Sequence, residues 1–135
     1  MAATWLNGGM DYKANLFMKR TAEQDLTVRL YTNNITPAVT DTAASYTECA
    51  LAGYANVTLT PANWAGGTAG GISSYAYPTL TFTFSAYAGG TTIYGYFVTI
   101  PGVIGVLAEL FSVPYVVPPG GGSLTVDVTY TDRKL

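Results

Sequence analysis

The chain has 135 residues, of which 49% are hydrophobic and only 10% are charged, and its net charge is −2. This length suits a single domain with a core of its own, and the hydrophobic content excludes a disordered chain. Six basic residues are too few for the dense positive surface that binds phosphate groups, so we expect neither nucleic acid nor a membrane as a partner.

Residues 1–24 differ from the rest, because they hold all three methionines and three of the six basic residues. Four apolar side chains recur there at helical spacing and predict a short helix over about residues 10–20. They are Met10, Ala14, Phe17 and Met18, and the segment Asn7-Gly8-Gly9 precedes them as a helix breaker. A helix of about three turns is marginal alone, so we expect it to dock on this chain's own sheet or on a neighbour. The pattern divides the chain into an N-terminal arm, residues 1–24, and a β domain, residues 25–135.

From residue 25 onward the apolar pattern has a period of two, which is typical of strands with one face in a core. The alternating segments are 26–31, 57–60, 79–84 and 124–131. Two further segments, 91–100 and 106–111, are apolar on both faces and are predicted to be central strands, or strands whose outer face meets a partner. The Pro101-Gly102 pair between them predicts a hairpin turn.

Turn residues cluster at 33–34, 61–63, 66–71 and 89–90, and residues 66–71 are interpreted as a flexible Gly-rich loop. Roughly six to eight short strands at this spacing predict an all-β fold, an antiparallel β-sandwich or jelly-roll-like domain. There is no strand–helix alternation that would favour a parallel sheet.

The residue types needed for catalysis are scarce. The chain has no histidine, which removes the commonest general base and most metal sites. Its single cysteine, Cys49, excludes an intrachain disulfide, and the charge of neighbouring Glu48 should raise the pKa of the thiol. Glu109 is the one acid in an apolar strand, where it can face solvent, pair with Arg29 or act in catalysis. We therefore expect no enzyme, no cofactor and no metal.

A single cysteine also suits synthesis in a reducing compartment. The first residues lack the basic and apolar regions of a signal peptide, and no run of about 18 apolar residues could span a membrane.

Aromatic residues are the most plausible contact groups, because eleven tyrosines and two tryptophans remain on a chain poor in charge. Some of them will pack in the core and at strand edges. Candidate partner-binding residues come from the arm and from the Tyr-rich strands around residues 75–96. They are Trp5, Tyr12, Leu16, Phe17, Lys19, Arg20, Tyr75, Tyr77, Tyr94 and Tyr96.

Several segments resemble small virion proteins of tailed bacteriophages. The resemblance rests on residues 26–37 (LTVRLYTNNITP), 41–48 (DTAASYTE), 53–55 (GYA), 92–98 (TIYGYFV) and 107–111 (LAELF), and on a Pro-rich stretch before the last strand. It implies a β-sandwich capsid decoration (cement) protein, made in the host cytoplasm and carried on the virion. Such proteins commonly form trimers on the shell, so the resemblance implies a homotrimer with the major capsid protein or another virion protein as partner. It carries no catalytic residues.

Three hypotheses from different classes follow. The first is a cement protein whose arm reaches a neighbouring subunit, so that deleting residues 1–20 would leave a folded domain that no longer binds. The second is a tail, neck or fibre component with a carbohydrate- or receptor-binding sandwich, based on the Tyr cluster and the 66–71 loop. The third is a lyase or hydrolase that uses Glu109, which full function of Glu109→Gln would dismiss.

Overall fold

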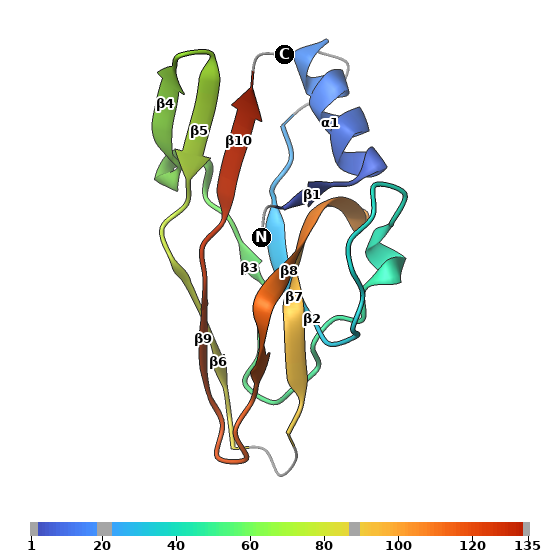
Figure 1. Ribbon diagram of the computed structural model, residues 1–135, viewed down its shortest axis with the longest axis vertical. Helices are drawn as coiled ribbons and strands as arrows, with labels where there is room; N and C mark the ends of the chain where they lie inside the picture. Colours follow the sequence, from blue (N-terminus) through green and yellow to red (C-terminus); the bar gives the residue numbers. More distant parts are fainter. Residues whose placement is uncertain (1–2, 19–22, 87–89, 134–135) are drawn as a thin grey trace.

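The computed structural model describes residues 3–18, 23–86 and 90–133 as an antiparallel β structure with one α-helix near the N-terminus (Figure 1). The predicted all-β, sandwich-like class is therefore confirmed. The elements in chain order are β1 (Thr4–Trp5), α1 (Asn7–Phe17), β2 (Thr27–Tyr31), the 3-10 helix Ala43–Ser45, β3 (Val57–Thr58), the 3-10 helix Pro61–Asn63, β4 (Ala65–Ala69), β5 (Ile72–Ala76), β6 (Leu80–Phe84), β7 (Thr92–Ile100), β8 (Ile104–Val116), β9 (Gly122–Val126) and β10 (Thr129–Arg133).

The first layer is a five-stranded sheet with the order β1-β8-β7-β2-β3. Its centre is the β7–β8 hairpin, whose turn at residues 101–103 confirms the turn predicted at Pro101-Gly102. Every residue of β7 from Gly95 to Ile100 is buried, as expected of a central strand. β8 runs beyond its predicted end at residue 111, and residues 111–114 form a bulge opposite Tyr94.

The second layer is a long two-stranded ribbon that changes register halfway along its length. Its lower part pairs β6 with β9, and its upper part pairs β5 with β10 and carries β4 on the edge (Figure 1). At the junction, residues 77–79 oppose only residues 127–128, so one side has an extra residue. Pro78 lies in this interruption and cannot donate a ladder hydrogen bond. The predicted single strand 124–131 is thus wrong, because this bulge divides it into β9 and β10.

The two parts of the ribbon differ in burial. In β6 every second residue is buried, and Leu80, Phe82 and Phe84 pack against β2 and β7 side chains in the main core. In β4 and β5 no residue is buried. The ribbon is therefore a normal sandwich layer below the bulge and a largely solvated sheet above it.

The Gly-rich segment 66–71 is not a flexible loop, as the sequence suggested, but most of the β4–β5 hairpin. The turn itself uses Gly70 and Gly71, both with positive φ, as a tight hairpin requires. Gly66 has a second role, because a side chain there would meet the backbone of Ser74 and Tyr75 on β5.

The helix begins earlier than predicted, since the expected breaker Asn7-Gly8-Gly9 forms its first turn. A Cβ atom on Gly8 would lie 2.7 Å from the Gly105 carbonyl oxygen, and one on Gly9 would overlap the Val106 backbone. These glycines therefore do not break the helix, and their lack of a side chain lets α1 approach β8 closely.

The predicted apolar face of the helix is also wrong, because Met10 and Met18 are 45% and 67% exposed. The sheet is instead contacted by Leu6, which is fully buried just before the helix, and by Gly9 and Tyr12. The described part of residues 1–24 thus docks on the chain's own sheet, through α1 and through β1, which pairs with β8.

A second cluster of buried residues lies apart from the main core. Leu6, Tyr31, Tyr46, Phe97 and Ala108 pack together, and the rings of Tyr46 and Phe97 stack with centroids 5.2 Å apart. Leu6 thus ties the N-terminal segment to strands β2, β7 and β8.

We predict that Leu6→Ala lowers the free energy of unfolding by about 2–5 kcal/mol, because it leaves a cavity in this second cluster. Urea denaturation followed by circular dichroism measures the change. Met10→Ala, on the exposed side of α1, is the matched control and should change stability little. Equal stability of Leu6→Ala and the parent chain would show that residues 3–18 are not part of the cooperative core.

Candidate functional site

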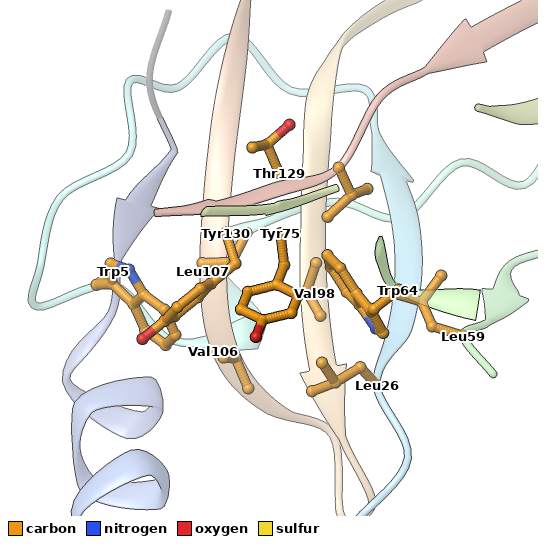
Figure 2. A pocket seen from close by; sticks show the side chains of 11 residues that line it. Trp5, Leu26, Leu59, Trp64, Tyr75, Val98, Val106, Leu107, Thr129 and Tyr130 are labelled. Atoms are coloured by element: carbon orange, nitrogen blue, oxygen red, sulfur yellow. The ribbon is translucent and has the colours of Figure 1, made fainter. Parts of the chain in front are cut away.

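An apolar cavity of about 260 Å³ lies between the five-stranded sheet and the upper part of the ribbon (Figure 2). It sits where β5 and β10 continue above the bulge and no longer interdigitate with the core as β6 does. Its lining consists of Trp5, Leu26, Leu59, Trp64, Tyr75, Val98, Val106, Leu107, Val128, Thr129 and Tyr130.

Aromatic rings form much of the cavity wall, and they come from four different segments. Figure 2 shows Trp5, Tyr130, Tyr75 and Trp64 in a row across the cavity. Tyr75 on β5 and Tyr130 on β10 are direct cross-strand neighbours, so they lie on the same face of the ribbon. The Trp5 and Tyr130 rings meet edge to face, with centroids 5.8 Å apart at 89°.

The cavity floor follows from the alternation of the central strands. Val98 on β7 and Leu107 on β8 are paired residues whose side chains point toward the ribbon. Leu26 and Leu59 border the floor at the start of β2 and the end of β3, where Leu59 N–H donates to the Leu26 carbonyl oxygen at 2.8 Å. Rigid strand backbone therefore positions the floor.

A salt bridge holds the helix to the ribbon beside the cavity. Lys13 Nζ on α1 lies 2.8 Å from Asp132 Oδ2 on β10, and it also lies over the Trp5 and Tyr130 rings, at 5.6 and 5.9 Å from their centroids. The Tyr130 hydroxyl donates to the same Asp132 oxygen at 3.0 Å. The hydrogen bond to Asp132 is the main cause of a raised pKa of Lys13. The cluster fixes the wall formed by Trp5 and Tyr130.

The predicted contact residues of the arm lie partly at this site. Trp5 lines the cavity, and Tyr12 and Leu16 line a neighbouring hollow of about 350 Å³ that shares Leu26, Leu59 and Trp64 with it. Lys19 and Arg20 fall outside the described residues, as does the side chain of Phe17.

The four predicted tyrosines have different surroundings. Tyr75 lines the cavity and is 38% exposed, and Tyr94 is half-buried against the second cluster. Tyr77 and Tyr96 are core residues with 9% and 1% of their surface exposed. A partner could reach the side chains of Tyr75 and Tyr94 only, so a partner-binding role stays a prediction for those two and for the arm residues.

Sequence reasoning missed Trp64, Tyr130 and Asp132. Tyr130 continues the apolar alternation of Val126 and Val128, and this pattern predicts that its side chain lies on the core side of the strand. The pairing of Lys13 with Asp132, far apart in the chain, has no local sequence signal.

Glu109 lines a third hollow, of about 300 Å³, together with Asp127, and this hollow shares Trp5 and Tyr130 with the cavity. Its carboxylate accepts a hydrogen bond of 2.9 Å from the buried Tyr96 hydroxyl, which joins β7 to β8. Arg29 forms an ion pair with Glu48, at 2.8 Å, rather than with Glu109. Arg29 also donates to buried Thr99, so this pair belongs to a structural network across β2 and β7.

Other reactive groups have structural surroundings. Cys49 is buried, and burial chiefly raises the pKa of its thiol, with the charge of Glu48 acting in the same direction. No group of three or more His, Cys, Asp or Glu side chains within the described ranges could hold a metal ion. Within the same ranges, no helix has the length and apolar character to cross a membrane.

Comparison with known proteins gave no match. No protein-family model, no curated protein and no solved structure is similar to this chain at a significant level.

We predict that the fold is lost cooperatively as the pH rises above about 10, the ordinary pKa of tyrosine. Burial raises the pKa of Tyr31 to about 12 and raises the pKa values of Tyr46, Tyr54 and Tyr96 further. Above pH 10 the unfolded chain releases these protons and the folded chain does not, so stability is full below pH 10 and falls as the pH passes through that range. Tyrosinate absorbance and circular dichroism should change together for these residues. Their ionisation with the β signal intact would contradict the prediction.

Proposed function

We propose that the chain is a non-enzymatic structural protein that assembles through strand and sheet contacts with other protein chains, as a capsid decoration protein of a tailed phage does. The single observation that carries the proposal is the unprotected edge of β4. The assignment to a virion rests in addition on the resemblance of residues 26–111 to small tailed-phage proteins.

β4 is an edge strand with none of the usual protection. Within the described residues it pairs with β5 alone, and all five of its residues, Ala-Gly-Gly-Thr-Ala, are exposed. Natural sheets protect such edges with charged side chains, proline or a covering loop, because unpaired N–H and C=O groups otherwise attract another strand. An edge without charge or proline is suited to pairing with a strand of another chain.

The outer face of the same hairpin is also free of charge. Alternation places Ala65, Gly67 and Ala69 of β4 beside Ser74 and Ala76 of β5 on the face away from the cavity, and all of them are exposed. Small uncharged side chains allow close approach of a second surface and need little ionic desolvation. Edge and face together offer one continuous contact area at one end of the molecule (Figure 1).

Exposed apolar side chains at the β8 bulge provide a second contact area. Val113, within the bulge of β8, is 79% exposed, and Val116, which pairs with Thr92 of β7 just beyond the bulge, is 56% exposed. A protein with two such areas can contact more than one neighbour, which suits one of many copies in a shell.

We predict that Gly67→Lys abolishes self-association, which we expect to be trimeric, without unfolding the chain. A Cβ atom on Gly67 meets nothing within 4 Å and the residue lacks a positive φ, so lysine fits the folded monomer. Its charge would then block the edge and outer face of β4. Size-exclusion chromatography with light scattering measures the assembly, and thermal unfolding checks the fold.

Gly120→Lys is the matched control, because a Cβ atom there also meets nothing within 4 Å and the residue lies in the turn before β9. It should assemble as the parent chain does. A parent chain that is monomeric, or a Gly67→Lys variant that assembles normally, would refute the role of the β4 edge. Mass spectrometry of purified phage particles from the producing culture tests the virion assignment separately, and absence of the chain from them would refute it.

A further inference from the structure

We propose that the cavity between the sheets is a binding site for a neutral, largely apolar small molecule that carries an aromatic ring or a short hydrocarbon chain. This inference goes beyond the proposed assembly function, which uses the opposite face of the β4–β5 hairpin. It rests on the size of the cavity, on the chemistry of its lining and on its position between two sheets.

The cavity is large and is partly open to solvent. Side chains between packed sheets normally fill the space to the density of an organic crystal. A cavity of about 150 Å³ lined by apolar side chains stays dry and admits benzene. The present cavity, at about 260 Å³, exceeds that size and has room for a molecule of one or two rings. Water alone fills such a space poorly, because it finds few hydrogen-bond partners there.

The lining excludes charged ligands and selects neutral ones. None of its side chains is charged, and most of its members are aliphatic or aromatic. An ionised ligand would lose its hydration without gaining an opposite charge. Sugars fit poorly for a related reason, since their many hydroxyl groups would lack partners.

The position of the cavity also excludes a polypeptide segment. β7 and β8 contribute to one wall and the paired strands β5 and β10 to the other. Two packed sheets lie roughly 10 Å apart, a depth that side chains usually occupy. A strand or helix placed there would bury amide groups against apolar side chains with no hydrogen-bond partner. An apolar small molecule has no amide groups that would be left without hydrogen-bond partners.

The aromatic wall indicates how the ligand would be held. Trp5 is fixed by its edge-to-face contact with Tyr130, and the Lys13–Asp132 salt bridge restrains both rings. Trp64 is held by a contact with Tyr77, with centroids 5.3 Å apart. Tyr75 lies between these fixed rings in Figure 2 and offers its own ring to the space. Prepositioned rings bind an apolar guest with little loss of side-chain entropy.

The test titrates the full chain with N-phenyl-1-naphthylamine, a neutral dye whose fluorescence rises in apolar surroundings. We expect saturable binding of one dye per chain. Leu26→Trp, a half-buried position on the cavity rim, and Tyr75→Ala, which removes a ring from the wall, should each weaken binding by about tenfold or more. Circular dichroism and the melting temperature establish that each variant is folded, and two variants on different walls guard against the misfolding of one.

Tyr94→Ala is the matched control, because it removes the same side chain from a half-buried position that packs against the second cluster. It should bind the dye as the parent chain does. The anionic dye 8-anilinonaphthalene-1-sulfonate should bind more weakly than the neutral dye. Absence of saturable binding, equal loss in Tyr94→Ala, or unchanged binding in folded Leu26→Trp and Tyr75→Ala would overturn the proposal.

Competition identifies which of the two neutral chemistries the site prefers. Displacement of the dye by 2-naphthol supports an aromatic ligand, and displacement by 1-octanol supports a hydrocarbon chain. Displacement by neither compound would overturn the proposal. Because Gly67→Lys lies on the opposite face, it should retain dye binding, so failure of the assembly proposal and failure of this one are distinguishable.

Discussion

The register change at Pro78 is the constraint on which the rest of the structure depends. One extra residue on the β5–β6 side of the ribbon separates a lower part that packs into the core from an upper part that is mostly exposed. The main-chain bond from Tyr77 N–H to the Val128 carbonyl oxygen, at 3.0 Å, keeps the two parts continuous. The cavity and the free edge of β4 therefore have a common origin, because both exist only where the ribbon has left the core.

The N-terminal segment contacts both layers where the ribbon diverges from the sheet. Glycines at positions 8 and 9 bring α1 against the backbone of β8, and Leu6 fills the second cluster. The same segment places Trp5 against Tyr130 and Lys13 against Asp132, so that it joins the two layers beside the cavity. The N-terminal segment therefore stabilises this chain's own fold, and any contact with another chain would be additional to that role.

Local patterns in the sequence were sufficient for the strand class and for much of the core. Alternation in Leu80, Phe82 and Phe84 and the apolar run in β7 predicted burial that the structure confirms. What local patterns lack is information on pairing. The bulge opposite Asp127 and Val128, the use of Gly8 and Gly9 for close approach, and the Lys13–Asp132 bond all depend on residues that are distant in the chain. The cavity could not be predicted, because it arises from an offset between two strands rather than from any segment.

The cavity wall joins the two ends of the sequence, since Trp5 belongs to the first strand and Tyr130 to the last. During synthesis the ribosome releases Trp5 long before β10 exists, so this wall closes only after β10 has emerged. Loop closure over such separations is slow, and a chain dominated by non-local strand pairs folds on the slower end of the scale. Until then β5 lacks its partner β10 and the β4–β5 hairpin stands alone. The cavity is therefore completed only when β10, the last strand to be synthesised, has paired with β5.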